Sequence, residues 1–208
     1  MQEIPEPSKR RLVLLSRLLT DRAVKNITSV QIESLTGWSA NLVRKDISLL
    51  GVKCGASNGY KVQELKEALD KALGTGSEKQ KCCIVGLGRM GQVLLDNAEL
   101  EESAFKIVAG FDSNVNRTEV LRSVFPLHPT TMLESVIKEE GISWAILTVN
   151  SEEAQELATR LAVCGIKGIV NYTPCILSLQ KEVAIENVCL LTALETLVAM
   201  KKDMAAVF

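Results

Sequence analysis

The feature that most restricts the fold is a glycine-rich stretch at 84–91, which reads Ile-Val-Gly-Leu-Gly-Arg-Met-Gly. It continues an apolar run that starts at Cys82, and this order is typical of the strand, turn and helix that open a dinucleotide-binding unit. Glycines there let the backbone approach a pyrophosphate, which lies at the positive end of the next helix. We predict a strand at 81–85, a helix at 90–97, and a cofactor-binding turn made of Gly86, Leu87, Gly88, Arg89, Met90 and Gly91.

An acidic residue stands at the end of the next expected strand. Residues 105–111 are mostly apolar, and Asp112 follows them. An acid about 20 residues past such a turn is able to bind both ribose hydroxyls of the cofactor and to repel a 2′-phosphate. Asp112 therefore favours NAD over NADP. The alternative is that Asp112 only begins a turn, because Ser113 and Asn114 come next.

The following region reads as alternating helices and strands. We expect a helix to 140 that is capped by Thr131 and Glu134, a helix at 151–164, and strands at 144–149 and 168–171. The apolar runs are continuous, which fits a parallel sheet buried on both faces. Ligands of such sheets bind beyond the carboxyl ends of the strands. The residues expected near the nicotinamide half of the cofactor are therefore Thr148, Val149, Asn150, Asn171, Tyr172, Thr173 and Pro174.

The N-terminal region has the outline of a helix-turn-helix. Leucines on one face predict a helix at 11–20, and Thr28 and Gln31 have the spacing of a capping box for a short second helix. A glycine-containing turn follows, and Ser39 is placed to cap a further helix at 40–50. A short helix, a turn and a longer helix with a polar, basic face are typical of DNA-binding proteins.

A hairpin is expected after these helices. Residues 52–54 and 60–62 are β-like runs, and Asn58-Gly59 between them is a pair that favours a tight hairpin turn. Such a hairpin would form the wing of a winged-helix domain.

Positive charge is concentrated in the front of the chain. Residues 1–62 carry ten Lys and Arg against five acids, a net charge of +5, whereas the whole chain has −1. The asymmetry predicts an anionic partner for this half, with chance as the alternative, and DNA fits because the second helix would enter the major groove. A small helical domain whose basic face is merely solvated is the other alternative. The predicted DNA contacts are Ser39, Ala40, Asn41 and Arg44 to base edges, Lys45 and Ser48 to phosphates, and Lys53 before the wing.

The chain lacks the pattern of an active site. Its one histidine, His128, lies between Leu127 and Pro129, where we expect a surface or loop position. None of the six cysteines forms a Cys-x-x-Cys pair, so buried reduced thiols are expected rather than a metal site or a disulfide framework. The residues after Pro174 are too few for a substrate domain. We therefore expect no catalytic residues, no metal and no enzymatic activity.

The C-terminal end predicts one amphipathic helix at 190–208. Its leucines need an apolar surface, most simply that of a second subunit. We thus expect a winged-helix DNA-binding domain at 1–76, a Rossmann NAD(H)-binding domain at 77–189, and a dimerisation helix at 190–208. No apolar stretch is long enough to span a membrane, and the N-terminus lacks the order of a signal peptide, so we expect a cytoplasmic protein without a membrane partner.

The chain resembles the Rex family of bacterial redox-sensing transcriptional repressors over nearly its whole length. The likeness is carried by 4–5, 43–48, 59–60, 84–91, 111–112, 165–174 and 183–188, of which Val43-Arg44-Lys45-Asp46 and Gly165-Ile166-Lys167-Gly168-Ile169 are the most specific. The resemblance implies an α/β chain with a winged-helix domain, a Rossmann domain for NADH or NAD⁺, and a C-terminal helix exchanged between two subunits. It also implies a homodimer that binds palindromic operator DNA and is released by NADH, with NAD⁺ competing.

Several positions depart from the family pattern. The wing at 55–59 lacks the expected basic side chain, and Asn150 replaces a usual proline. Cys189 stands where the family has an aspartate, and Leu190 stands where it has an aromatic residue. The family's aspartate is expected to pair with an arginine, which Arg17 matches here. The alternatives therefore include a paralogue that binds DNA but has lost or changed the discrimination between NADH and NAD⁺. A small NAD-dependent oxidoreductase and a module for another adenine nucleotide are the others.

Overall fold

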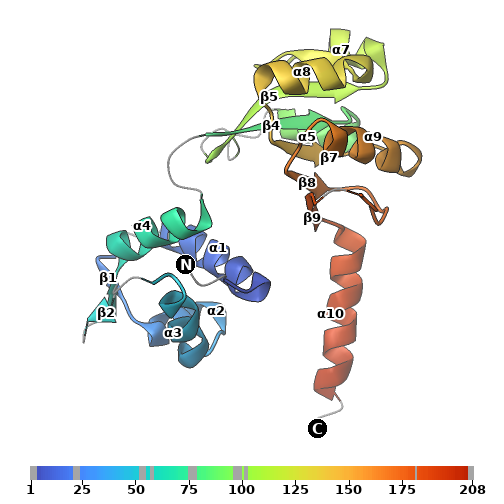
Figure 1. The fold of residues 1–208 in the computed structure, drawn as a ribbon. Helices are drawn as coiled ribbons and strands as arrows, with labels where there is room; N and C mark the ends of the chain where they lie inside the picture. Colours follow the sequence, from blue (N-terminus) through green and yellow to red (C-terminus); the bar gives the residue numbers. More distant parts are fainter. Residues whose placement is uncertain are drawn as a thin grey trace. The chain divides into compact units, whose positions relative to one another are not determined.

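The structure is a computed structural model that describes residues 4–20, 24–51, 55–56, 59–74, 79–95, 100, 103–180 and 182–205. The chain divides into two compact units, Met1–Glu78 and Lys79–Phe208 (Figure 1). Each unit has its own hydrophobic core. The domain boundary expected at 76 falls outside the described residues and stays a prediction.

The N-terminal unit combines helices with a small antiparallel sheet. The helices are α1 (Glu6–Thr20), α2 (Ser29–Thr36), α3 (Ala40–Ser48) and α4 (Val62–Leu73). The strands β1 (Asn26–Ile27), β2 (Gly55–Ala56) and β3 (Gly59–Lys61) lie in the order β1-β3-β2. β2 and β3 are antiparallel neighbours, as a hairpin requires, but β2 lies at Gly55–Ala56, where the sequence predicted the loop. The strand predicted at 52–54 lies outside the described residues. Lys53 and residues 57–58 lie outside the described residues.

The connection between α2 and α3 is built from the residues that the sequence singled out. Thr28 accepts the Gln31 N–H at 3.1 Å, and the Gln31 side chain accepts the Thr28 N–H at 2.8 Å, which completes the capping box. Gly37 then ends α2 at a φ of 74°, a conformation that glycine adopts without strain. Ser39 caps α3 by accepting the Leu42 N–H at 3.3 Å. These local contacts set the turn of the helix-turn-helix.

An ion pair between α1 and α3 fixes the second helix of this motif. Asp46 is only 4% exposed, and Arg11 donates to both of its oxygens, from Nε at 2.6 Å and from Nη2 at 3.0 Å. Burial raises the pKa of the Asp46 carboxyl, but hydrogen bonds from Arg11 and Ser8 outweigh burial, and the pKa is lowered overall. The apolar core of the unit includes Leu12, Leu15, Leu19, Ile32, Val43, Ile47, Leu65 and Leu69.

We expect Asp46→Asn to destabilise the protein by about 2–3 kcal/mol, because Arg11 loses a charged partner that it holds at two points. In the wild type this contribution is complete above the ordinary carboxyl pKa of 3.8 and is lost as the pH falls through the lowered pKa. Urea unfolding near neutral pH and below about pH 3 measures both effects. Arg10→Ala removes an exposed charge from the neighbouring position, and an equal loss in this control would contradict the role of the pair.

A six-stranded sheet forms the centre of the second unit. Its strands, in spatial order, are β6 (Leu127–Pro129), β5 (Phe105–Asp112), β4 (Gln80–Val85), β7 (Trp144–Leu147), β8 (Gly168–Asn171) and β9 (Ala184–Asn187). Every neighbouring pair is parallel. Counted from β4, the order is 3-2-1-4-5-6, which is that of the Rossmann fold. The expected α/β fold with a parallel sheet is confirmed.

Helices cover both faces of this sheet (Figure 1). On one face the core side chains of β4, β5 and β7 pack with those of α8 and α9, and on the other face they pack with those of α5. Strands buried in this way need continuous apolar runs, which is the pattern that the sequence has. The helical segments are α5 (Arg89–Leu95), α7 (Val115–Val120), the 3₁₀ turn η1 (Thr130–Met132), α8 (Leu133–Glu140) and α9 (Ser151–Val163).

Two neighbouring cysteines of β4 point to opposite faces of the sheet. Cys82 packs with the α5 side and Cys83 with the α8 and α9 side, and both are buried outside any disulfide. Burial raises the pKa of the Cys82 thiol to about 12 and that of Cys83 well above its ordinary value. The thiolate is the reactive form of cysteine, so both thiols are inert at neutral pH.

Two local predictions were wrong in this unit. Thr131 does not cap a helix: a 3₁₀ turn precedes α8, which starts at Leu133 without a side-chain cap. The reason is that the Glu134 carboxylate accepts from Arg160 of α9 at 2.6 Å, and is therefore committed elsewhere. His128 is not a loop residue, since it lies half-buried in β6 beside the Phe111 ring, with ring centroids 5.8 Å apart.

The C-terminal helix, α10 (Leu190–Ala205), follows β9 (Figure 1). Its apolar side chains between Leu190 and Met200 are exposed. Leu190, Leu191 and Leu197 are 77%, 64% and 61% exposed. A helix of this composition is unusual without an apolar partner surface. Within the described part of the chain, no helix is long and apolar enough to cross a membrane.

Candidate functional site

The glycine turn after β4 is as tight as the sequence predicted. Gly86 has a φ of 101° and donates its N–H to the Phe111 carbonyl at 2.8 Å. A Cβ on Gly91 would lie 1.9 Å from the Gly86 carbonyl oxygen, which no side chain tolerates. Only glycine at both positions lets α5 start this close to the strand.

Gly88 is glycine for a different reason. A Cβ built on it would meet no atom within 4 Å, so the chain itself leaves the space above this residue open. The residue sits between the strand and the helix, where a Rossmann fold places the pyrophosphate of a dinucleotide. The residues present therefore fit such a cofactor: two glycines close the turn, and the third leaves room for the ligand.

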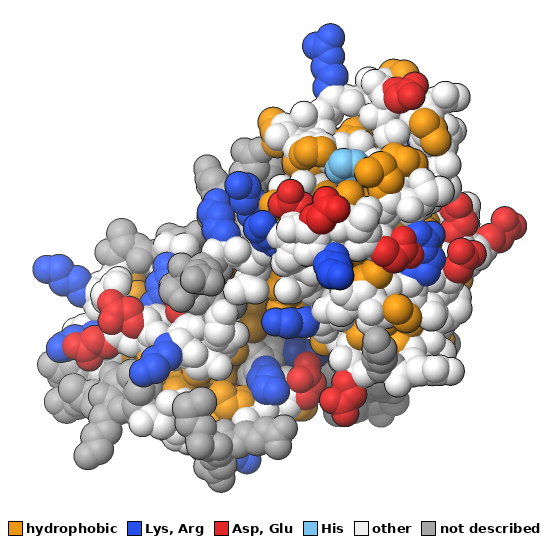
Figure 2. All heavy atoms as spheres, turned by 45° about the horizontal axis from the view of Figure 1, so that its top comes forward, with side chains coloured by type: hydrophobic (Ala, Val, Ile, Leu, Met, Phe, Trp, Pro, Cys, Tyr) orange, Lys and Arg blue, Asp and Glu red, His pale blue; other side chains and the backbone are white. Residues whose placement is uncertain are grey.

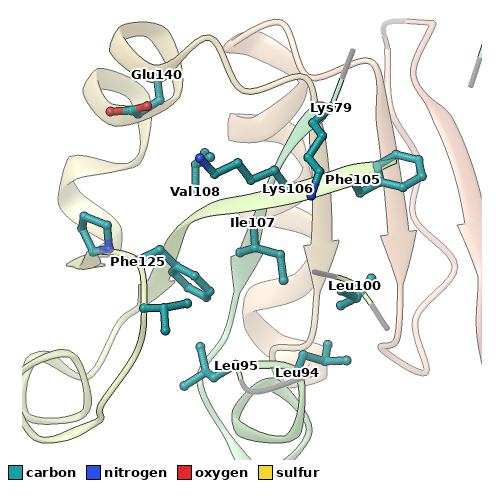
Figure 3. Close-up of a pocket in the computed structure, with 12 residues that line it drawn as sticks. Lys79, Leu94, Leu95, Leu100, Phe105, Lys106, Ile107, Val108, Phe125 and Glu140 are labelled. Atoms are coloured by element: carbon teal, nitrogen blue, oxygen red, sulfur yellow. The ribbon is translucent and has the colours of Figure 1, made fainter. Parts of the chain in front are cut away.

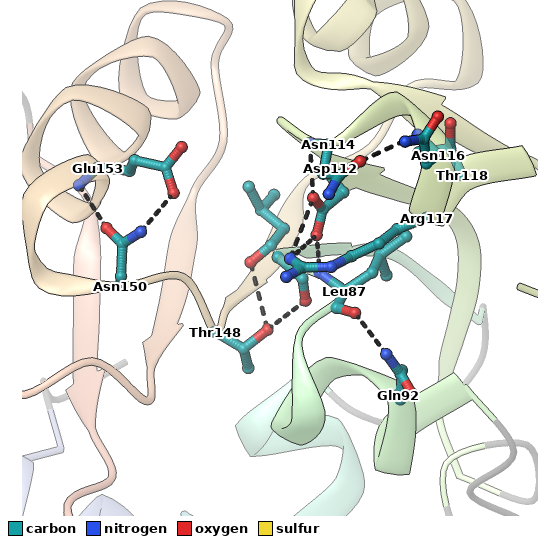
Figure 4. Close-up of polar contacts among 12 residues, drawn as sticks. Leu87, Gln92, Asp112, Asn114, Asn116, Arg117, Thr118, Thr148, Asn150 and Glu153 are labelled. Atoms are coloured by element: carbon teal, nitrogen blue, oxygen red, sulfur yellow. Dashed lines mark hydrogen bonds and ion pairs between the residues drawn. The ribbon is translucent and has the colours of Figure 1, made fainter. Parts of the chain in front are cut away.

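Three side chains hold the turn from outside (Figure 4). The Leu87 N–H donates to Asp112 Oδ2 at 2.6 Å, and Gln92 Nε2 donates to the Leu87 carbonyl at 3.0 Å. The Thr148 hydroxyl donates to the Gly86 carbonyl at 2.6 Å. The turn is thus preorganised by the ends of β5 and β7 and by α5.

The predicted acid, Asp112, ends β5 and is 2% exposed. Besides the Leu87 N–H, it accepts the Asn114 N–H at 2.7 Å, and Arg117 of α7 forms an ion pair with it at 3.3 Å (Figure 4). The acid therefore lies beside the glycine turn, and its contact with the Asn114 N–H forms the turn of the alternative interpretation. Binding of the ribose hydroxyls by Asp112 stays a prediction.

The carboxyl ends of β7 and β8 supply the remaining residues of this edge. Val149 is half-buried against the turn, and Asn150 caps α9 by accepting the Glu153 N–H at 3.0 Å. Tyr172 is half-buried and Pro174 is exposed on the segment after β8. Because all strands are parallel, these residues share one edge of the sheet with the glycine turn.

The Asn171 side chain is engaged inside the chain, and its predicted contact with the cofactor stays a prediction. It is fully buried, and its Nδ2 donates to the Cys175 carbonyl and to Asn187 Oδ1, each at 2.9 Å. Its Oδ1 accepts the Thr173 N–H at 3.0 Å and the Thr173 hydroxyl at 2.7 Å. With its amide engaged inside the chain, Asn171 fixes the loop after β8 and leaves ligand contacts to the residues of that loop.

A cavity of about 430 Å³ lies away from this edge (Figure 3). It is lined by the start of β5, including Phe105 and Ile107, by Leu94 and Leu95 of α5, and by Phe125 before β6. None of the predicted site residues lines it. The cavity is therefore distinct from the glycine turn.

The exposed face of α3 carries the predicted DNA-binding side chains, with one exception. Asn41, Arg44, Lys45 and Ser48 are exposed, whereas Ala40 is only 9% exposed because its start-of-helix position faces the core. Ala40 is thus not available to base edges as expected. On the one face of the molecule that Figure 2 draws, Lys and Arg side chains are interspersed with acidic and apolar ones.

Arg44 is held in place by two neighbours. Its Nη1 donates to Ser29 Oγ of α2 at 2.7 Å, and its Nη2 donates to Asn41 Oδ1. Ser29 is buried and belongs to the first helix of the motif. The guanidinium is therefore preoriented at the surface of α3, and no pattern in the sequence indicates this link.

Comparison with known proteins covers both units. A family model described as "CoA binding domain" matches residues 77–175, and one described as "Putative DNA-binding protein N-terminus" matches residues 3–48. The redox-sensing transcriptional repressor Rex of Thermotoga petrophila is 32% identical over 201 residues, which cover 94% of this chain and 95% of that protein. Rex of Listeria monocytogenes is 28% identical over 94% of this chain and 92% of its own length.

Solved structures agree with these relatives. The Rex-family repressor RSP superimposes with a TM-score of 0.86 at 28% identity and covers 99% of this chain and 97% of its own. For RSP in complex with β-NAD⁺ and operator DNA, the TM-score is 0.88, and 99% of this chain and 96% of that chain are covered. For RSP in complex with β-NADH, the TM-score is 0.84, and the covered shares are 99% and 98%.

The first unit is a helix-turn-helix with a small antiparallel sheet, and the second is a Rossmann sheet with an open glycine turn. This combination is that of a DNA-binding protein with a nucleotide site. The similarity extends over almost the whole chain at more than 30% identity. The chain belongs to the Rex family of redox-sensing transcriptional repressors.

Gly91→Ala is expected to destabilise the second unit by about 3 kcal/mol, because the new Cβ collides with the backbone of the turn. Gly88→Ala is the matched control, since its Cβ meets nothing, and its melting temperature should stay near that of the wild type. Thermal unfolding by calorimetry measures both. Equal melting temperatures for the two variants would contradict this geometry of the turn.

Proposed function

We propose that this chain is a redox-sensing transcriptional repressor. It binds operator DNA as a homodimer and is released when NADH occupies the glycine turn, with NAD⁺ competing for the same site. The observation that carries the proposal is the presence of both surfaces in one family member: an open glycine turn in the second unit and an exposed, preoriented arginine on α3 in the first. RSP has been solved in complex with β-NAD⁺ and operator DNA and in complex with β-NADH, and the match to this chain covers at least 96% of the length of RSP in both structures.

The nucleotide serves as a signal in this proposal and need not react. A ligand shifts an equilibrium between two states only by its difference in affinity for them. If NADH favours a dimer in which the two α3 helices are wrongly spaced, the dimer no longer fits adjacent major grooves, which lie about 34–36 Å apart. The chain then leaves the DNA without any chemical step, and the proposed repressor is not an enzyme.

We assign the nucleotide contacts to the edge of the sheet described above. When bound, the cofactor would supply only its oxidation state as the signal, and the chain would supply the binding. The proposed domains are 1–76 for DNA, 77–189 for NAD(H) and 190–208 for dimerisation. The proposed contacts are Gly86, Leu87, Gly88, Arg89, Met90, Gly91, Asp112, Thr148, Val149, Tyr172 and Pro174 for the nucleotide, and Ser39, Asn41, Arg44, Lys45, Ser48 and Lys53 for DNA.

The homodimer is supported by α10. Its exposed leucines and the 61% exposed Val198 form apolar surface that a second copy of the chain would cover. A two-fold dimer also explains why an operator would be palindromic, since each α3 reads one half-site. Sedimentation or small-angle scattering that found a monomer would contradict this part. We place the repressor in the cytoplasm, where its DNA is.

A second candidate is a family member with altered sensing. Cys189 and Leu190 lie at the junction of β9 and α10, where the family expectation is an aspartate and an aromatic residue. A thiol stands here in place of a carboxylate, and hydrogen bonds with Thr192 lower its pKa. Such a chain would bind DNA and nucleotide but respond differently to NADH and NAD⁺.

Fluorescence anisotropy with labelled genomic fragments tests the proposal. NADH, NAD⁺ and NADPH are added in turn to the protein–DNA complex at low salt. Release by NADH that NAD⁺ counteracts supports the main proposal, and equal effects of NADH and NAD⁺ support the second candidate. Phosphate contacts give every domain of this type some nonspecific affinity, so no DNA binding at low salt would rule out both.

Gly88→Val is expected to abolish nucleotide binding and leave DNA binding intact, because a Cβ at this position meets no atom of the chain within 4 Å and the side chain would project into the open space above the turn. Titration of the intrinsic fluorescence of NADH measures the first effect, and anisotropy with and without NADH measures the second. The variant should behave as a repressor that no longer responds. Unchanged NADH affinity would refute this position for the pyrophosphate.

Arg44→Ala is expected to weaken operator binding by about 1–3 kcal/mol if Arg44 contacts a base. Ser29→Ala keeps the guanidinium but removes its buried anchor, and we expect a smaller loss of the same kind. Anisotropy on operator and on unrelated DNA measures both. A loss that is equal on all sequences would show instead that Arg44 contacts a phosphate.

A further inference from the structure

The start of α3 is held by two side chains, one of which belongs to α2. Ser39 accepts the Leu42 N–H at 3.3 Å, and Glu33 Oε2 accepts the N–H of Ala40, the first residue of α3, at 3.2 Å. The first N–H groups of a helix have no partner inside it, and a negative charge is favourable beside them. The Glu33 side chain is therefore tied to this end of α3, although it belongs to the preceding helix.

One oxygen of this carboxylate is left for a ligand. Glu33 is exposed, and in the part of the chain that the structure describes only its Oε2 atom accepts a hydrogen bond. An ionised carboxylate accepts hydrogen bonds and cannot donate them. The Oε1 atom thus presents a positioned, negatively charged acceptor at the N-terminal end of α3.

The neighbouring side chains of α3 supply donors instead. Arg44 Nη2 donates to Asn41 Oδ1, and this contact leaves the amide hydrogens of Asn41 for other acceptors. Arg44 itself has only donors, and both side chains are exposed. Of these three polar side chains, Glu33 is the one that offers a base an acceptor and no donor.

Among the four bases, cytosine best fits a charged acceptor. In the major groove cytosine shows its N4 amino group, adenine shows an amino group beside the N7 acceptor, and guanine and thymine show acceptor oxygens. A carboxylate is therefore satisfied by cytosine and is repelled by guanine, thymine and the backbone phosphates. The N-terminal residues of the second helix of a helix-turn-helix contact base edges, so an acceptor at this end of α3 is placed to make the distinction.

We propose that Glu33 is a specificity-determining residue of the proposed DNA surface, which accepts a hydrogen bond from the N4 amino group of a cytosine in each half-site. This rests on the proposed function, in which α3 enters the major groove. Cytosine is selected because it satisfies the carboxylate, whereas a base without a donor leaves a charge unpaired in the groove. The contact between Oε2 and the Ala40 N–H sets the position of the carboxylate before DNA arrives.

The test selects binding sites from random-sequence DNA with the full chain, first with the wild type and then with Glu33→Gln. The single side-chain oxygen of the variant is able to keep the Ala40 N–H, so that the outward group becomes a donor. We expect one cytosine that is preferred by the wild type to lose its preference in the variant. Replacement of that C·G pair by T·A should weaken wild-type binding about fivefold to a hundredfold in fluorescence anisotropy, and should weaken binding of the variant at least about fivefold less.

Two controls separate base recognition from folding. Glu67→Gln removes an exposed acid from α4, where it accepts from Gln63, and should leave the selected site unchanged. A DNA that carries 2-pyrimidinone at the selected position lacks the 4-amino group of cytosine, and should weaken wild-type binding without any change in the protein.

The same cytosine preference in the wild type and in Glu33→Gln overturns the proposal and leaves the proposed function intact. A gain in affinity by Glu33→Gln that is equal on all sequences also overturns it, because Glu33 then only repels phosphates. Unchanged wild-type affinity for the 2-pyrimidinone DNA overturns the contact with the amino group. No DNA binding by the wild type overturns the proposed function itself.

Discussion

The nucleotide site depends on the hydrogen bond from the Leu87 N–H to the Asp112 carboxylate. This 2.6 Å contact ties the turn after β4 to the end of β5, and both residues are buried. A buried carboxylate without donors would cost several kcal/mol, so the position of Asp112 requires the turn to stay closed. The close approach is possible only because Gly86 and Gly91 lack side chains. The turn, the acid and the ends of two strands therefore form one rigid group, against which a ligand finds a fixed surface.

The first unit also contains a buried carboxylate that is held by hydrogen bonds. Asp46, like Asp112, is buried and accepts from an arginine, and in each case the pair lies next to the segment that we propose for ligand binding. Arg11 and Asp46 fix α3 against α1, and Ser29 then orients Arg44 at the surface of α3. Each unit thus presents charged groups whose geometry is set before binding. Preorganised groups lose less entropy when the ligand arrives, which favours binding.

Much of the fold follows from local pattern. The glycine turn, the buried parallel strands and the capping box at Thr28 are visible in the sequence because glycine, apolar runs and cap residues act over short distances. Arg117 was not predicted, since its contact with Asp112 depends on how α7 folds back on β5. Thr131 failed as a cap because Glu134 pairs with Arg160, a contact across 26 residues that no local pattern reveals. Local sequence patterns therefore predict the helices, strands and turns, whereas the partners of individual polar side chains depend on contacts between distant parts of the chain.

The two cysteines of β4 are protected from oxidation by their burial. Cys82 and Cys83 are enclosed on opposite faces of the strand that leads into the glycine turn, and their thiols stay protonated. Peroxide acts on thiolates and therefore does not attack this strand. An oxidant that attacks exposed thiols would therefore leave the strand that supports the proposed nucleotide site unmodified. Binding of the proposed nucleotide signal would thus not depend on the oxidation of these two cysteines.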